Sequence, residues 1–458
     1  MDPPEPRLRA WWLPPEVVEA LGLESPGAGA ASALSLDDAV QLCRWLKARR
    51  ARQLERSALE IAGDLGRVSE RWLEQRGAAW RAATEERVAA ETGYPRPMIA
   101  RSLDHFFQAH SGAALASLLR DRFGEPSALD GFWPSVAGRS RAFGPAMTLL
   151  FASGNVPVAP LATIYHSLLV KSPCVARAPS GSPSMLTALA RSIWETEPAL
   201  GACVAVLGWD RGNREMIALL ASQADAVVTF GSDATLESIR ADVPPHVRFV
   251  GHGHRLGFGV IGREGLEDAV IDQTAAEAAV DVAAFDQQGC MSPHWFYVEE
   301  GGEATPEAFA ARLAATLERL QEDWPRRALS PPEASAIHQA RATWEVRPDA
   351  RVWRSAGTEW TVIYTTDDGP DTGPLNRFVF VKPVPDATRN LPLPAVIGRH
   401  LQTVTCALAP ERLAELAARL GQLGVTRLCP LGRAQEPLAG HHDGRDPLVD
   451  LVRWVDVE

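Results

Sequence analysis

Apolar residues recur at helical spacing in the first part of the chain, from Ser35 to about Ala90. In LDDAVQLCRWLKARRARQLERSALEI they stand three or four positions apart among Glu, Lys and Arg, which are good helix formers. Ser35 lies three residues before Asp38, so its hydroxyl can accept from the unpaired amides of a first helical turn. The pattern predicts a helical region over residues 1–140 that packs on the domain after it.

The pattern changes at Ala146, where short apolar runs begin to alternate with amphipathic segments of helical length. Buried parallel strands joined by helical crossovers produce this alternation. The predicted strands are MTLLFA, CVARA, CVAVL, AVVTF and VRFV. They indicate a doubly wound, Rossmann-like sheet of the kind that binds nucleotides, over residues 141–257.

A second α/β series follows the first. It contains predicted strands at FGVIG, HWFYVE, WTVIYTT, RFVFVKPV and LQTVTCAL. Predicted helices lie at LEDAVIDQTAAEAAVDV, PEAFAARLAATLERL and ERLAELAARLGQLG. We therefore expect a second α/β domain over residues 258–430 and a C-terminal segment at 431–458.

The composition is that of an ordinary globular protein, because 46% of the 458 residues are hydrophobic and 22% are charged. A net charge of -11 leaves no surplus to neutralise a phosphate backbone, so we expect no nucleic-acid partner. The six cysteines lack CxxC spacing and the N-terminus does not resemble a secretion signal, which favours free thiols in the cytoplasm. Ser153, Gly154, Asn155 and Pro157 interrupt the apolar tract Met147–Val170, so we expect no stable membrane insertion there.

Cys290 stands in FDQQGCMSPHWFYVE, directly before a predicted strand. A cysteine is usually a small apolar filler of the core. Here the preceding Gln-Gln-Gly is a poor helix or strand interior and Pro293 stops a helix, which places the thiol on a tight loop. Functional side chains are common on such loops, so Cys290 is a candidate nucleophile.

Two further candidates follow predicted strands of the first series. Asn155 lies after MTLLFA, at the edge where open parallel sheets bind ligands, and its amide could donate to an oxyanion. The simpler interpretation is an asparagine that forms a turn. Gly231 and Ser232 follow AVVTF and precede a helix whose first amides suit a pyrophosphate, although Ser232 could merely cap that helix.

The order of these pieces resembles a known arrangement. The runs S-G-N-x-P, R-A-P-S, F-G-S and Q-G-C-M-S-P are similar to those of the aldehyde dehydrogenase superfamily. Within it, FGSDATLESIR, HGHRLGFGVI, QQGCMSPHWFYVE and HHDGRDPLVDLVRWVDVE resemble the acyl-CoA reductase branch, the LuxC type that supplies fatty aldehyde in bacterial bioluminescence. The resemblance extends from about Phe143 to the end and implies an aldehyde dehydrogenase-like α/β fold.

The resemblance implies a reaction as well. Cys290 would attack the thioester of an acyl-CoA or an acyl carrier protein, and its own amide and Asn155 would hold the oxyanion. Hydride from a reduced nicotinamide would then give a thiohemiacetal that collapses to an aldehyde. The family also implies a homo-oligomer and acyl-transfer partner subunits.

One departure from the superfamily concerns water. Aldehyde-oxidising members carry a glutamate in an E-L-G-G run that activates water, whereas this chain has GHGHRLG, Gly251 to Gly257. The missing glutamate favours reduction, because water would hydrolyse the acyl-enzyme. His252 or His254 could donate a proton, and His254 is our candidate catalytic residue; a structural histidine is the alternative.

A second departure concerns the cofactor. Members that prefer NAD place a glutamate where VARAPSGSP has Arg177 and Ser180, and this change suits the extra phosphate of NADPH. The glutamate of an E-x-F-G-P run is not evident around GPLNRFVFVKPV. The predicted cofactor contacts are Ser153, Gly154, Arg177, Ser180, Gly231 and Ser232.

Several other functions remain open at the level of sequence. His252, His254, His441 and His442 could gather around a metal with Asp443, but their separation along the chain makes this weak, so we expect no metal site. The rival classes are a metal-dependent hydrolase, a non-catalytic acyl-transfer scaffold, and an aldehyde dehydrogenase that forms an acid with another residue in place of the glutamate.

Overall fold

A computed structural model describes residues 8–23, 32–124, 127–136, 138–210, 212–367, 369–389, 391–437 and 440–458. The chain divides into two compact units. Unit 1 comprises residues 1–92, 100–253 and 437–458, and unit 2 comprises residues 93–99 and 254–436. The finer four-part division expected from the sequence stays a prediction.

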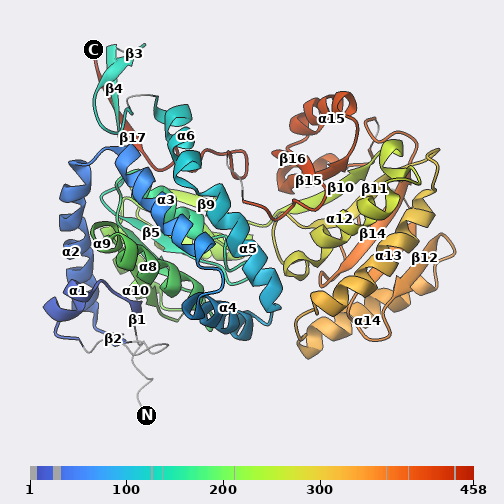
Figure 1. Cartoon of the computed structure of the whole chain (residues 1–458), viewed down its shortest axis with the longest axis horizontal. Coiled ribbons are helices and arrows are strands. Elements are labelled where there is room, and N and C mark those ends of the chain that lie inside the picture. Colours follow the sequence, from blue (N-terminus) through green and yellow to red (C-terminus); the bar gives the residue numbers. More distant parts are fainter. Residues whose placement is uncertain are drawn as a thin grey trace. The chain divides into compact units, whose positions relative to one another are not determined.

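A seven-stranded sheet forms the centre of unit 1 (Figure 1). Its strand order is β2-β1-β7-β6-β5-β8-β9. Its strands are β1 (Leu8–Trp12), β2 (Ser32–Leu34), β5 (Thr148–Phe151), β6 (Cys174–Arg177), β7 (Val204–Gly208), β8 (Ala226–Phe230) and β9 (Arg248–His252). The five strands from β5 to β9 are parallel. Their bounds match those of the five predicted apolar runs to within one or two residues. Their order is that of a doubly wound sheet that starts at β5, builds outward through β6 and β7, and returns to place β8 beside β5.

Helices cover both faces of this sheet. On one face the apolar sides of α1, α2, α10 and α11 enter a core with Leu149, Val175 and Val227 of the strands. The other face is covered by α7 and α8, on which α3 packs. The helices of unit 1 are α1 (Pro15–Ala20), α2 (Leu36–Leu54), α3 (Ala58–Glu74), α4 (Ala79–Thr92), α5 (Arg96–Ala109, whose first four residues belong to unit 2), α6 (Gly112–Phe123), α7 (Leu161–Leu169), α8 (Ser184–Thr196), α9 (Pro198–Gly201), α10 (Arg214–Gln223) and α11 (Asp233–Asp242).

The predicted start of the first long helix is confirmed. Ser35 caps α2 by accepting from the Asp38 amide, while the Asp38 carboxylate accepts from the Ser35 amide. Short strands interrupt the region expected to be helical. Of these, β1 pairs antiparallel with β7 and β2 pairs antiparallel with β1, which extends the sheet.

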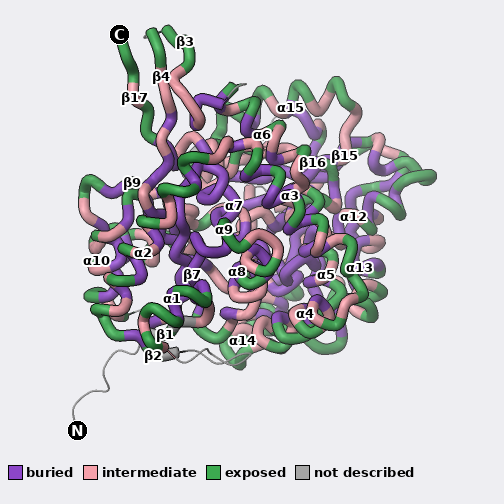
Figure 2. Tube along the Cα trace, turned by 60° about the vertical axis from the view of Figure 1, so that its left-hand side comes forward, coloured by how far each residue is buried: buried purple, intermediate pink, exposed green. Residues whose placement is uncertain are grey.

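A small three-stranded sheet joins the middle of the chain to its end. Strand β4 (Gly138–Phe143) pairs antiparallel with β3 (Trp133–Ser135) on one side and with β17 (Arg453–Val457) on the other. These strands are mostly exposed, whereas the central strands of unit 1 are buried (Figure 2).

Unit 2 contains a second seven-stranded sheet, in the order β12-β13-β14-β11-β10-β15-β16. Its strands are β10 (Leu256–Ile261), β11 (Pro293–Glu299), β12 (Ala350–Arg354), β13 (Thr361–Thr365), β14 (Phe378–Val384), β15 (Leu401–Ala407) and β16 (Arg427–Pro430). They are parallel except for β12. The helices α12 (Ile271–Ala283) and α13 (Pro306–Asp323) contact the sheet, and α14 (Pro331–Glu345) and α15 (Pro410–Gln422) bury Ile337, Trp344, Leu416 and Leu420 against strand residues such as Phe380.

None of the helices in the described ranges combines the length and the apolar character that crossing a bilayer requires.

The buried histidine His110 makes the stability of unit 1 depend on pH. Its Nδ1 donates to the Phe106 carbonyl oxygen at 2.8 Å, and burial lowers its pKa to about 4. Because the unfolded chain takes up this proton near pH 6.5, the free energy of unfolding should fall between about pH 6.5 and 4, by at most about 1.4 kcal/mol per pH unit. We expect His110→Gln to remove this contribution in urea unfolding at pH 6.5, 5.5 and 4.5. The exposed His246→Gln should keep it; equal slopes for both variants would contradict the account.

Candidate active site

Cys290 lies in a tight turn directly before β11. The Ser292 amide donates to the Gly289 carbonyl at 3.1 Å, so Cys290 and Met291 occupy the two central positions of the turn. The turn therefore presents the thiol on a loop at the start of a buried strand, as the sequence predicted.

Cys290 differs from the other cysteines in its exposure. All six are free thiols, and Cys290 is half-buried while the other five are buried. Burial raises the pKa of Cys43 and Cys429 to about 11 and that of Cys174 and Cys203 to about 12, and it also raises the pKa of Cys406. A thiol must ionise and be reached to act as a nucleophile, so Cys290 is the best candidate among them.

The side chain of Gln287 closes the loop that carries Cys290. Its Nε2 donates to the Pro293 carbonyl at 2.8 Å and to the Phe378 carbonyl at 3.3 Å, while its Oε1 accepts from the Phe378 amide at 2.7 Å. The two ends of the loop are thereby fixed to each other and to β14.

A buried ion pair holds the residues that lead into this loop. Arg377 Nε lies 2.8 Å from Asp286 Oδ1, and neither side chain is exposed. Desolvation raises the pKa of Asp286 and lowers that of Arg377, while their mutual attraction opposes both shifts. The pair joins two turns of left-handed backbone, one at residues 285–287 and one at 375–377. The Asn376 amide also donates to the Asp286 carbonyl at 3.0 Å.

The other side of the loop packs against Gln435 and Gly257. Gln435 Nε2 donates to Ser292 Oγ at 2.9 Å. A Cβ at Gly289 would lie 2.4 Å from Gln435, and one at Gly257 would lie 2.6 Å from the Ser292 carbonyl oxygen. Gly257 is therefore needed for the close approach of the two backbones, whereas a side chain at Gly289 would displace the end of Gln435.

In unit 1, the predicted ligand-binding residues lie at the carboxyl edge of the sheet. Phe151 at the end of β5 pairs with Thr229 of β8, so the loops after these two strands leave the same edge. Asn155 is exposed in the first loop, where Ser153 and Gly154 are half-buried. In the second loop, after Gly231, Ser232 caps α11 by accepting from the Thr235 amide at 3.3 Å.

Arg177 and Ser180 differ sharply in exposure. Arg177 is 6% exposed, donates to the Trp209 carbonyl at 3.0 Å and lies over the Trp209 ring. Ser180 is exposed in the loop after β6. Of these two predicted cofactor contacts, Ser180 is the more accessible.

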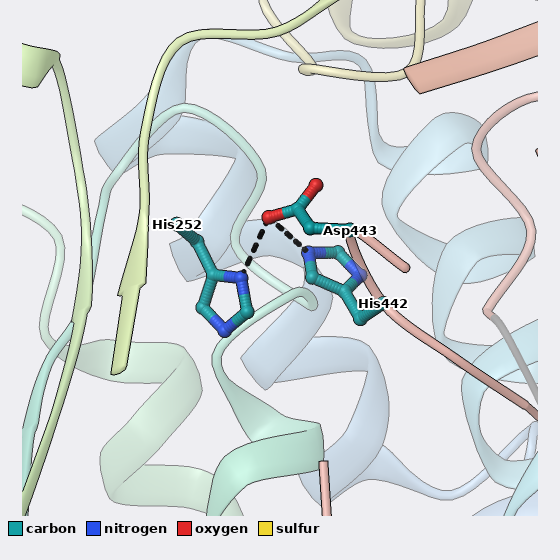
Figure 3. Close-up of side chains that lie close together, drawn as sticks. All are labelled: His252, His442 and Asp443. Atoms are coloured by element: carbon teal, nitrogen blue, oxygen red, sulfur yellow. Dashed lines mark hydrogen bonds and ion pairs between the residues drawn. The ribbon is translucent and has the colours of Figure 1, made fainter. Parts of the chain in front are cut away.

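The two histidines of GHGHRLG have different surroundings. His254 is exposed in unit 2, where its ring centroid lies 6.1 Å from that of His400. His252 ends β9 in unit 1 and lies beside His442 and Asp443 (Figure 3). Because His252 and Asp443 lie 191 residues apart, the sequence indicated only weakly that they cluster with His442. The Asp-Gly dipeptide of HHDG was the available signal, because it favours a tight turn.

Solved aldehyde dehydrogenases have this fold. Aldehyde dehydrogenase 21 from Physcomitrella patens aligns with a TM-score of 0.69 and 12% sequence identity over 94% of this chain and 92% of that chain. The expected aldehyde dehydrogenase-like α/β fold is thus confirmed.

The family follows from the sequence. The family model described as acyl-CoA reductase (LuxC) matches residues 57–454, and the chain belongs to this family. Among curated relatives, the long-chain acyl-protein thioester reductase of Vibrio harveyi is 26% identical over 356 residues, which are 76% of this chain and 72% of the relative. The enzyme of the same name from Aliivibrio fischeri is 25% identical over 358 residues, with 76% and 71% covered.

The buried pair below the Cys290 loop gives a test of this architecture. We expect Arg377→Met to lower the free energy of unfolding by about 3–5 kcal/mol, because Asp286 would remain buried without its partner. Urea unfolding measures the loss. The matched control is Arg389→Met, whose exposed partner is Glu415 and whose removal should cost less than about 1 kcal/mol. Equal losses would contradict a supporting role for the buried pair.

Proposed function

We propose that this chain reduces an acyl thioester to an aldehyde through an acyl intermediate on Cys290, with NADPH as the reductant. The observation that carries the proposal is the setting of Cys290. Its thiol is half-buried, whereas the other five thiols are buried, and its turn is held by Gln287 and Gln435. An accessible thiol on a rigid loop suits attack on a carbonyl carbon.

The proposed chemistry begins at the sulfur of Cys290. The sulfur forms a bond to the thioester carbon, and the carbonyl electron pair moves onto oxygen. The Cys290 backbone amide and the Asn155 side chain donate to this oxyanion. When the electron pair returns, the bond to the donor sulfur breaks and the acyl group stays on Cys290. The exposed position of Asn155 at a sheet edge supports its proposed role as a donor to the oxyanion.

A dinucleotide fits the carboxyl edge of the unit 1 sheet. The direction of winding reverses between β5 and β8, and ligands of doubly wound sheets bind at such a point. Ser153 and Gly154 in one loop and Gly231 and Ser232 in the other would hold it, with the start of α11 suited to a pyrophosphate. Bound there, a reduced nicotinamide supplies the hydride that converts the acyl-cysteine to an aldehyde.

The preference for NADPH rests on the loop after β6. The run Ala178–Ser182 contains no carboxylate that would repel a 2′-phosphate. Ser180 offers an exposed hydroxyl there, whereas Arg177 reaches inward to Trp209. Reduction is favoured over hydrolysis because GHGHRLG contains no glutamate to activate water.

The acyl donor and the assembly belong to the proposal too. We propose an acyl-CoA as the donor, while the relatives' names point to a protein-bound acyl thioester. A homo-oligomer is supported by Trp133 and Trp454, which are 37% and 43% exposed on the three-stranded sheet. Acyl-transfer partner subunits and a cytoplasmic location stay predictions.

Mass spectrometry after addition of acyl-CoA without NADPH tests the function. We expect the wild-type chain to gain one acyl mass on the peptide that contains Cys290, because no hydride is present to release it. Cys290→Ser should form no thioester adduct.

The matched control is Cys429→Ser, which removes a buried thiol of the same unit and should leave the adduct intact. A wild-type chain that gains no acyl mass from either acyl-CoA or an acyl-protein thioester would refute the proposed function.

A further inference from the structure

A two-residue hairpin turn places Asp443 beside the end of the unit 1 strand β9. His442 and Arg445 exchange two backbone hydrogen bonds, each of 2.9 Å, across Asp443 and Gly444. The φ angles of Asp443 and Gly444 are 53° and 70°, as a type I′ turn requires, and Asp-Gly is a preferred sequence for this turn. The local sequence therefore fixes where the Asp443 carboxylate points.

His252 is held on three sides by this turn and by β8. Its Nδ1 lies 2.8 Å from Asp443 Oδ2, its ring stacks on Phe230 at 4.7 Å, and the His442 ring meets it edge-on at 4.6 Å. The Asp443 side chain is only 2% exposed, against 12% for His252. Because an ionised carboxylate only accepts, Nδ1 carries the hydrogen and Nε2 is left to exchange a proton. In Figure 3, Nε2 points away from Asp443.

His252 and His442 also line a small cavity in unit 1. Its other ionisable lining residues are His166 of α7, Arg445 and Asp450. Burial lowers the pKa of His166 to about 3, so this ring stays neutral, while Arg445 is paired with Asp450 at 2.8 Å. Asp443 is thus the carboxylate in hydrogen-bond contact with the His252 ring.

The distances favour a hydrogen-bonded pair over a metal site. Ligand atoms around a tetrahedral zinc ion lie about 3.3 Å apart, given bonds of about 2.0–2.1 Å. The 2.8 Å contact between His252 and Asp443 is a hydrogen bond, and His442 Nε2 lies 3.9 Å from the same oxygen. The arrangement matches an imidazole oriented by a carboxylate, as in proton-transfer catalysts.

We propose that His252 is the proton donor of thioester reduction and that Asp443 is its positioning residue. This inference rests on the proposed function. When the carbon–sulfur bond to the donor breaks, its electron pair goes to the donor sulfur, and His252 Nε2 gives that thiolate a proton. His252 then regains a proton from solvent. With the hydride, the sum is one thioester, one hydride and one proton converted to one aldehyde and one thiol.

The test compares two acyl donors in the formation of the acyl-enzyme, measured by rapid quenching and mass spectrometry. An acyl-CoA releases a basic thiolate that needs a proton, whereas a 4-nitrothiophenyl thioester releases a weakly basic thiolate that does not. With acyl-CoA, we expect His252→Gln to slow acylation by about 10²-fold or more and Asp443→Asn by about 10-fold. With the nitrothiophenyl ester, both variants should acylate Cys290 at nearly the wild-type rate.

A structural role for the pair would slow both donors equally, and that result would overturn the inference. Binding of one equivalent of Zn²⁺ by the wild type that Asp443→Asn abolishes would overturn it as well. His246→Gln, at an exposed histidine of the same unit, is the control and should react normally with both donors. Failure of the proposed function looks different, because the wild type would then acylate Cys290 with neither donor.

Discussion

The ion pair between Asp286 and Arg377 is the constraint on which the candidate active site depends. Both side chains are completely buried, so neither tolerates the loss of the other. Their contact joins two turns of left-handed backbone, residues 285–287 and 375–377. Such backbone is costly for residues other than glycine and persists only where its surroundings enforce it. The strained residues 285–287 lie shortly before Cys290, and Gln287 fixes the loop to β14.

The candidate residues of unit 1 are positioned in a different way. Parallel strands end together, so the loops after β5 and β8 and the end of β9 bring Asn155, Ser232 and His252 to one edge without any single supporting contact. The C-terminal segment then adds Asp443 through a tight turn. Unit 2 thus fixes a nucleophile by buried polar contacts, and unit 1 places donors and a cofactor surface by sheet topology.

The repeating parts of the fold were predictable from the sequence, and contacts distant along the chain were not. The buried strand runs and the Ser35 cap depend on neighbouring residues, so local patterns predicted them. The loop position of Cys290 was predictable because glycine and proline mark its turn. The pairing of Asp286 with Arg377 spans 91 residues, and positive φ angles at Phe285–Gln287 have no local signal. The inward direction of the Arg177 side chain, toward Trp209, is likewise set by packing with residues distant in the sequence.

The central claim is that the acyl group on Cys290 is an intermediate that hydride converts to an aldehyde. The most direct measurement is a single turnover of isolated acyl-enzyme, freed of donor and mixed with NADPH in the absence of added thiol. The account predicts that aldehyde forms in an amount equal to the acylated Cys290, that one NADPH is oxidised for each, and that the acyl mass disappears. Release of the acyl group as a carboxylic acid, or its persistence on Cys290, would contradict the account.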